Sequence, residues 1–156
     1  MSSPEARLKA LGIELPPPPS PAANYVTATR SGRLVFLAGQ GPMAGGQVVW
    51  RGKVGGDLTE EQGYQAARLT ILNSLAILRQ TLGSLDEVTR ILKLLAWVRC
   101  VDGFEHPHRV VNGASDLLVE VFGERGRHAR SAVTAHELPL GIAVEIELVA
   151  EAATEA

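Results

Sequence analysis

The sequence contains one cysteine, Cys100, and few aromatic residues, which make up 4% of its 156 residues. A single thiol cannot form a disulfide within the chain, and it excludes a zinc site built from several cysteines. With so few aromatic residues, the core must consist mainly of aliphatic side chains. Hydrophobic residues reach 46% and charged residues 21%, a balance that excludes a wholly disordered or fibrous chain.

Long apolar runs are also missing. No stretch approaches the roughly 18 uninterrupted apolar residues that a membrane span needs. Glu5, Arg7 and Lys9 stand where a signal peptide would have its apolar segment. We therefore expect a cytoplasmic protein with no membrane partner.

The chain has no excess of basic charge, since 15 Lys and Arg residues face 17 Asp and Glu residues. Proteins that bind nucleic acid through its phosphates usually carry a basic excess or stripe. The small basic cluster at 125–130 is diluted by Glu120 and Glu124, and the glycines at 39–46 and 52–56 do not match a phosphate-binding loop. We expect no nucleic-acid partner, and ribonuclease action is the weakest functional interpretation.

Residues 1–23 are predicted to form an N-terminal, proline-rich extension, and residues 24–156 a single domain. The segment 4–15 permits a short helix, which the four prolines at 16–19 end in favour of an extended conformation. We interpret the extension as a spacer on the surface, outside the core.

Two helices are predicted from their ends and their apolar spacing. Thr59 and Gln62 match a capping box, apolar residues follow at spacings of three and four, and Gly83 marks the end. Pro107 suits the first turn of the second helix, which Gly123 ends. Strands are predicted, in chain order, at 25–30, 33–38, 47–51, 88–100, 131–138 and 142–151.

The resulting order β-β-β-α-β-α-β-β is typical of an α+β fold, with helices on one face of a mixed sheet. The nearly continuous apolar run at 91–98 predicts a strand buried on both faces. The turn residues at 139–141 place the last two strands as sequential neighbours.

The segment most suggestive of chemistry contains Arg130, Glu145 and Glu147. A simple structural interpretation is an internal ion pair, or glutamates exposed to solvent. A functional interpretation is a pocket in which arginine binds a carboxylate and a partly desolvated glutamate takes a proton from water. A tight turn at 139–141 puts Arg130 opposite about residue 149 or 150, and a shift of one residue would move it to the face opposite the glutamates. A pocket between subunits would escape this constraint.

Other candidate groups are weaker. His106 and His108 flank a proline without a third ligand, so no metal site is expected. His128 and His136 have no clear serine or cysteine partner for a catalytic triad. Cys100, at the end of an apolar strand, is expected to be a buried hydrophobic residue.

Several segments together resemble a known family. They are Arg130-Ser-Ala-Val, Leu138-Pro, Val144-Glu-Ile-Glu, the strand end Gly39-Gln-Gly-Pro, Tyr25 in the first strand and Val111-Asn112 in the second helix. These resemble the YjgF/RidA family of reactive-intermediate (enamine/imine) deaminases, also called endoribonuclease L-PSP-like or translation initiation inhibitors, over about residues 24–150.

The resemblance implies a chorismate-mutase-like fold with two helices on one face of the sheet, and a homotrimer with pockets between subunits. It implies that Arg130 holds a substrate carboxylate and Glu145 orients the attacking water. Tyr25, Asn112, Gly39 and Ala132 match positions that line the pocket. The implied enzyme is a hydrolase of the 2-iminobutanoate/2-iminopropanoate deaminase type, which forms a 2-keto acid and ammonia without a cofactor.

The chain also departs from the family pattern. Ala38 replaces a serine, and Ala132 replaces a cysteine two residues after the arginine. The extension is not part of the short form of the family, and the chain resembles a longer, uncharacterised branch. An alternative function is therefore a trimer that binds small carboxylates or keto acids without turnover.

Overall fold

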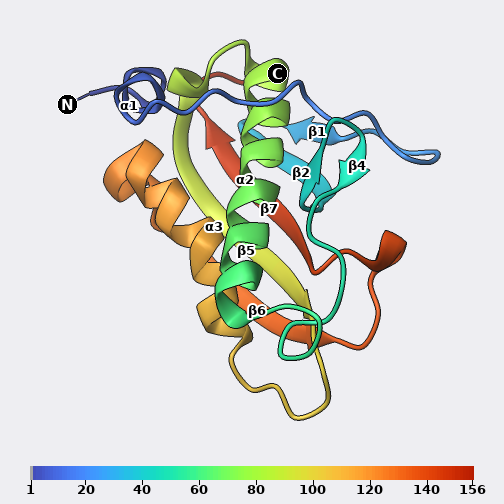
Figure 1. Ribbon diagram of the computed structural model, residues 1–156. Helices are drawn as coiled ribbons and strands as arrows, with labels where there is room; N and C mark the ends of the chain where they lie inside the picture. Colours follow the sequence, from blue (N-terminus) through green and yellow to red (C-terminus); the bar gives the residue numbers. More distant parts are fainter. Residues whose placement is uncertain (1) are drawn as a thin grey trace.

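The computed structural model describes residues 2–156, which form one main sheet with its helices (Figure 1). The strand order in the sheet is β1-β2-β7-β5-β6. These strands are β1 (Ala28–Ser31), β2 (Leu34–Gln40), β5 (Val88–Arg99), β6 (Ala129–Ala135) and β7 (Val144–Ala152). Only β5 and β6 are parallel, and the other neighbours are antiparallel, so the predicted mixed sheet is confirmed.

The helices are α1 (Pro4–Ala10), α2 (Glu60–Leu82) and α3 (Pro107–Phe122), with single turns η1 (Leu85–Glu87), η2 (Gly123–Gly126) and η3 (Pro139–Gly141). The predicted capping box is confirmed, because Gln62 N–H donates to Thr59 Oγ1 and Thr59 N–H donates to Gln62 Oε1. Helix α2 ends at Gly83, whose φ of 84° is left-handed, as a C-terminal glycine allows.

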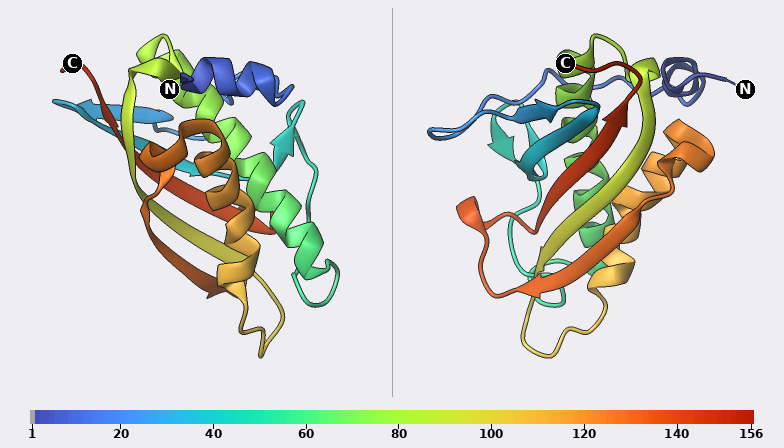
Figure 2. Two further views of the ribbon diagram at one scale, coloured as in Figure 1. Left: turned by 90° about the vertical axis from the view of Figure 1, so that its left-hand side faces the viewer. Right: turned by 180° about the vertical axis from the view of Figure 1, so that it is seen from behind.

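Helices α2 and α3 cover one face of the sheet, and the other face is open in the single chain (Figure 2). The core between them is aliphatic, as the composition predicted. Its largest fully buried side chains are Leu8, Ile71, Leu75, Ile77, Leu78, Leu85, Ile91, Leu94, Leu117, Leu118, Ile146 and Leu148.

The prediction that the last two strands are neighbours is wrong. Strand β7 lies between β2 and β5, and β6 pairs in parallel with β5 at the edge of the sheet. The sequence between β6 and β7 contains Pro139 and Gly141, which indicated a tight hairpin, but η3 turns the chain away from β6. The parallel pairing requires a crossover, which α3 provides.

The prediction that β5 is buried on both faces is also wrong for the single chain. Its burial alternates, with Leu94, Ala96 and Val98 fully buried under the helices. Leu95 and Trp97 face the open side and are only partly buried. The apolar run therefore contributes alternate residues to the buried face under the helices and to an apolar face that is uncovered in the single chain.

The strand predicted at 47–51 does not join the main sheet. Its first residues form β4 (Gln47–Val48), which pairs only with β3 (Met43–Ala44). Asn73 of α2 holds this small hairpin in place, because its amide donates to the carbonyl oxygens of Gly41 and Met43 at 3.0 and 2.9 Å.

The N-terminal segment does more than cover the surface. Leu8 of α1 is 2% exposed and belongs to the core. The Glu5 carboxylate accepts hydrogen bonds from Arg79 of α2 at 3.0 and 2.6 Å and from Leu85 N–H at 2.9 Å. The partly buried Ile13 and Leu15 also pack against the core, so apolar contacts and an ion pair attach the predicted extension to the domain.

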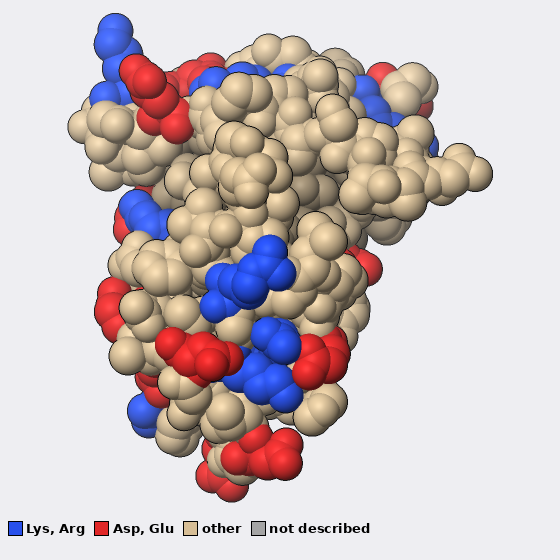
Figure 3. Space-filling view, turned by 45° about the vertical axis from the view of Figure 1, so that its right-hand side comes forward, with Lys and Arg blue, Asp and Glu red and all other residues tan. Residues whose placement is uncertain are grey.

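None of the helices within residues 2–156 is long and apolar enough to cross a membrane. On the face shown in Figure 3, basic side chains lie in small patches beside acidic ones rather than in one continuous stripe. Lys53 and Arg99 both form ion pairs with the carboxylate of Glu137.

Candidate functional site

Arg130 lies in the edge strand β6, opposite the buried Leu94 of β5, and its side chain is turned toward α3. Its Nη1 donates to Asn112 Oδ1 at 2.9 Å and to Ser115 Oγ at 3.0 Å, and its Nη2 donates to the His108 carbonyl oxygen at 3.0 Å. These three acceptors follow one another on α3 at spacings of four and three, so they share one face of the helix. The structure thus brings together Arg130 and Asn112, two of the predicted site residues.

None of these three acceptors is a carboxylate, and Arg130 forms no ion pair with the described residues 2–156. A guanidinium has five N–H groups, and three are used here, which leaves Nε–H and one Nη2–H. Those two lie on one edge of the planar group and match the two oxygens of a carboxylate. Burial lowers the pKa of Arg130, and the charge of Asp116 opposes that shift, but an arginine keeps its charge at neutral pH.

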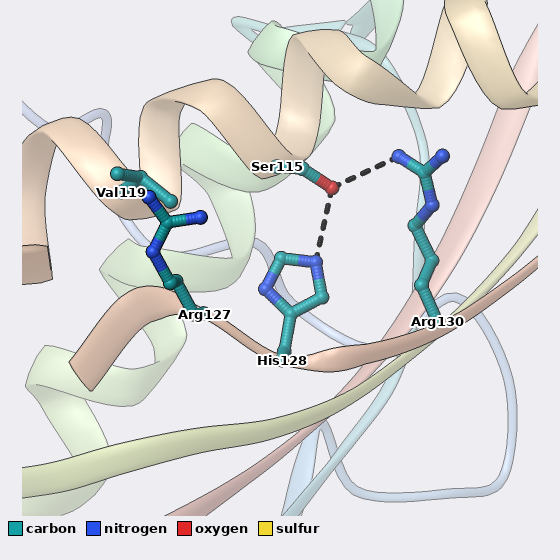
Figure 4. A pocket seen from close by; sticks show the side chains of 5 residues that line it. All are labelled: Ser115, Val119, Arg127, His128 and Arg130. Atoms are coloured by element: carbon teal, nitrogen blue, oxygen red, sulfur yellow. Dashed lines mark hydrogen bonds between the residues drawn. The ribbon is translucent and has the colours of Figure 1, made fainter. Parts of the chain in front are cut away.

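The prediction that His128 lacks a serine partner is wrong. Ser115 Oγ lies 3.0 Å from His128 Nε2 (Figure 4), and the Gly126 carbonyl oxygen lies 2.7 Å from His128 Nδ1. Ser115 and His128 line a cavity of about 240 Å³ together with Val119, Arg127 and Arg130. Burial is the main reason that the pKa of His128 is lowered, and the neighbouring charge of Arg130 adds to it.

Glu145 lies on the other side of the sheet. It stands opposite Trp97 of β5, and Glu147 stands opposite Leu95, so both carboxylates point to the open face. The Glu145 carboxylate rests against Gly39, where an added Cβ would overlap Oε1. Burial raises the pKa of Glu145, and the charge of Glu147 raises it further.

A second hollow, of about 430 Å³, opens beside these carboxylates. It lies on the open face between β1, β2 and β7, and Tyr25 and Gly39, two of the predicted pocket residues, both line it. Its full lining is Tyr25, Val26, Thr29, Phe36, Leu37, Ala38, Gly39, Glu147, Leu148 and Val149. The alanine at position 38 contributes no hydroxyl group here.

The predicted site residues therefore fall into two groups on opposite faces of one chain. We call Asn112, Ser115, His128 and Arg130 the arginine half, and Tyr25, Gly39, Glu145 and Glu147 the glutamate half. Ala132 lies on the same face as Arg130, since it pairs with the buried Ala96. The idea that Arg130 faces the glutamates from a neighbouring strand is wrong within one chain, because β5 separates β6 from β7.

Sequence reasoning missed Ser115 and the His108 carbonyl. The spacing 108, 112, 115 is a helical face and could have grouped them with Asn112. Nothing local, however, indicates that β6 would lie beside that face. Among the described residues, no cluster of three or more His, Cys, Asp or Glu is arranged to hold a metal ion.

Comparisons with known proteins agree on one family. The model of the family described as "YjgF/chorismate mutase-like, putative endoribonuclease" matches residues 5–152. Protein TCP17 of Trypanosoma cruzi is 42% identical over 147 residues, which cover 94% of this chain and 92% of that protein.

Two solved structures have the same fold over nearly their whole length. A "putative endoribonuclease" from Shewanella oneidensis is 36% identical, with a TM-score of 0.93 over 96% of this chain and 99% of that one. The protein Atu1372 of Agrobacterium tumefaciens, of unknown function, is 42% identical, with a TM-score of 0.89 over 96% and 92%.

Proposed function

The chain belongs to the YjgF/chorismate mutase-like family, and from this membership and its two charged half-sites we propose that it hydrolyses 2-imino and 2-enamino acids to 2-keto acids and ammonia. The proposed pocket lies between copies of the chain, where the arginine half of one copy meets the glutamate half of the next. The proposed substrate is a small acid, and no cofactor takes part.

The observation that carries this proposal is the unpaired charge of Arg130. Its guanidinium is fixed by three neutral acceptors on α3 and keeps one edge free. A fixed guanidinium with a free edge binds a planar carboxylate through two parallel hydrogen bonds. Such an arrangement favours a carboxylate ligand over a purely structural ion pair.

Glu145 supplies the second requirement of the reaction. Its raised pKa makes the carboxylate a better base than an ordinary glutamate. In the proposed reaction, it takes a proton from water as the water oxygen bonds to the imine carbon, and the imine nitrogen gains a proton. Glu145 then passes its proton to the amino nitrogen of the resulting carbinolamine, the carbon–nitrogen bond breaks, and ammonia leaves with the bonding electrons. The hydroxyl group releases its proton to solvent as the keto group forms, which balances the proton that the imine nitrogen gained.

The open face of the sheet supports assembly into a ring of copies. Phe36 and Val133 are exposed there at 43% each, and Val133 stands opposite the partly exposed Trp97. Exposed apolar groups gathered on one face mark an interaction surface. An interface that joins two different faces of the chain closes into a ring when its rotation permits, and the family resemblance gives three copies.

The direct test is release of ammonia and keto acid from an imine generated in situ by an amino-acid oxidase, with the spontaneous rate subtracted. We expect acceleration by the wild-type protein and a loss of roughly 100-fold in Arg130→Ala. Arg109→Ala is the matched control, because Arg109 is an exposed arginine of α3 whose only ion pair with residues 2–156 is a long one of 3.9 Å. Acceleration that persists in Arg130→Ala would contradict the proposed role of Arg130.

A second candidate is a carboxylate-binding protein without turnover. Ala38 and Ala132 favour it, because they leave the pocket without a hydroxyl and a thiol that the family resemblance assigns to these positions. This candidate predicts that Arg130→Ala abolishes keto-acid binding while the wild-type protein accelerates no imine, whether small, branched or aromatic.

A further inference from the structure

The arginine half contains two residues, Ser115 and His128, that the proposed reaction does not use. Figure 4 shows the hydrogen bonds from Arg130 to Ser115 and between Ser115 and His128, and a further bond from His128 reaches the backbone at the end of η2. Three consecutive bonds of 3.0, 3.0 and 2.7 Å join Arg130 Nη1, Ser115 Oγ, the His128 ring and the Gly126 carbonyl oxygen.

When the His128 ring is neutral, the chemistry of the end groups fixes the direction of every bond in this chain. The Gly126 carbonyl oxygen can only accept, so His128 Nδ1 carries a hydrogen. In the neutral ring Nε2 is then an acceptor, and the Ser115 hydroxyl donates to it. The hydroxyl oxygen therefore turns its lone pairs toward Arg130, whose Nη1–H can only donate.

The surroundings keep this direction in place. Burial lowers the pKa of His128 and the charge of Arg130 lowers it further, and together they outweigh the hydrogen bond to the Gly126 carbonyl, which raises it, so the neutral ring is favoured. The other charged groups nearby are Arg127, paired with Glu124 at the surface, and Asp116, which acts on Arg130. Gly126 packs so tightly on α3 that an added Cβ would overlap the Leu118 carbonyl oxygen, and this contact fixes the last acceptor.

We propose that Ser115 and His128 are positioning residues that lock the guanidinium of Arg130, so that its free edge stays presented to the carboxylate of the ligand. This inference rests on the proposed function for the identity of the ligand, but the locking itself needs no ligand. Asn112 and the His108 carbonyl oxygen accept from two other N–H groups of Arg130. We call the hydrogen-bonded chain from Ser115 through His128 to the Gly126 carbonyl the relay, and its Ser115 hydroxyl is the third acceptor for Arg130.

The locking is tested first without ligand, by nitrogen NMR of the arginine side chains. The Arg130 signals are assigned by their absence from Arg130→Lys. We expect separate, slowly exchanging Nη signals in the wild-type protein and exchange at least about tenfold faster in Ser115→Ala, with a smaller increase in His128→Phe. Ser115→Thr, which keeps the hydroxyl, should restore slow exchange.

The matched control is Ser74→Ala, which removes an equally small hydroxyl from a buried site in α2, where Ser74 donates to the Thr70 carbonyl oxygen. It should leave the Arg130 signals unchanged. If the Arg130 Nη signals exchange equally slowly in the wild-type protein and in Ser115→Ala, the proposal is overturned. It is also overturned if Ser74→Ala speeds this exchange as much as Ser115→Ala does.

The consequence for binding is tested with 2-oxobutanoate and its carboxamide by calorimetry. We expect Ser115→Ala to weaken binding of the acid about tenfold and of the carboxamide less than about twofold, since only the acid uses the charged edge. Equal weakening of both would indicate a general structural defect and overturn the proposal. If the wild-type protein binds no keto acid, the proposed function fails, and the NMR result still decides whether Arg130 is locked.

Discussion

The two halves of the proposed site are held in opposite ways. Arg130 is fixed by three acceptors on α3, and one of them, Ser115, is itself hydrogen-bonded to His128. Glu145 accepts no hydrogen bond from any of the described residues, and its nearest charged neighbour is another carboxylate, Glu147. Among the described residues, the Arg130 guanidinium is therefore held in place by neutral acceptors and has no ion-pair partner. The Glu145 carboxylate has neither a hydrogen-bond donor nor an ion-pair partner.

This difference shows which half carries the cost of function. Bonds from a cation to neutral acceptors stabilise the arginine half while they leave its charge available. A partly buried glutamate beside a like charge destabilises the folded chain at neutral pH. The raised pKa that suits Glu145 to act as the base of the proposed reaction also makes it costly to stability.

The largest expected effect comes from separating the two halves onto different copies. Arg130→Ala and Glu145→Gln should each lose roughly 100-fold in imine hydrolysis. When the two inactive variants are unfolded together and reassembled in equal amounts, random mixing leaves one interface in four with both groups intact. Roughly a quarter of wild-type activity should therefore return. No recovery from assembled mixtures would place both groups of each pocket in one copy and contradict the two-half arrangement.

A matched pair of glycine substitutions should separate the halves by stability. Gly126→Ala, in the arginine half, places a Cβ against the backbone of α3 at Leu118, which cannot move without shifting the helix. We expect a loss of about 2 kcal/mol, seen as a fall of roughly 4–8 °C in the melting temperature. An unchanged melting temperature would show that the contact at Gly126 is loose and that the relay acceptor is not fixed.

Gly39→Ala, in the glutamate half, makes the same change with a different consequence. The added Cβ meets the end of the Glu145 side chain, which can rotate away. Stability should therefore change by less than about 1 kcal/mol, while imine hydrolysis falls about tenfold because the carboxylate is displaced. Kinetics and melting curves on the same preparation decide this, and a large stability loss with normal activity would reverse the expected order.

The two helices were predictable from the sequence because their ends are local. The capping box at Thr59 and the proline at the start of α3 act within one helical turn, so reading them requires no knowledge of distant contacts. The pairing of the strands was not predictable in this way. Pro139 and Gly141 indicated a hairpin, whereas the parallel place of β6 depends on how α3 packs across the sheet.

The polar residues of the candidate site show the same limit. Arg130 and Glu145 were predicted from short segments, but the face of the sheet on which each lies depends on strand order. The Ser115–His128 bond joins positions 13 residues apart, and it forms only because β6 begins beside α3. The pairing of Ser115 with His128 can therefore be predicted only when the crossover from β5 through α3 to β6 is known.

The titration of the two halves should also differ in sign, first at Glu145. Its pKa in the folded chain is raised, so the wild-type protein loses stability as pH rises from about 4, the unfolded value, through the folded value. Glu145→Gln removes this loss. Because the group is half-exposed, we expect a gain of at most about 1 kcal/mol at pH 7, or roughly 2–4 °C, that vanishes near pH 4. A loss of stability instead would indicate that Glu145 is paired with a cation in the assembled protein.

The smallest expected effect is the opposite slope at His128. Its folded pKa is lowered, so the neutral ring is favoured in the folded chain, and stability is lost as pH falls below about 6.5 toward the folded value. His128→Phe should flatten this part of the profile, whatever it does to stability at pH 8. One proton sets an upper limit of about 1.4 kcal/mol per pH unit, and partial exposure keeps the slope well below it. Urea unfolding of both proteins between pH 5 and 8 measures it, with His136→Phe as the control for loss of an imidazole elsewhere. Parallel profiles for the wild-type protein and His128→Phe would show that His128 titrates alike in the folded and unfolded chains. The folded structure would then not favour the neutral His128 ring that the relay requires.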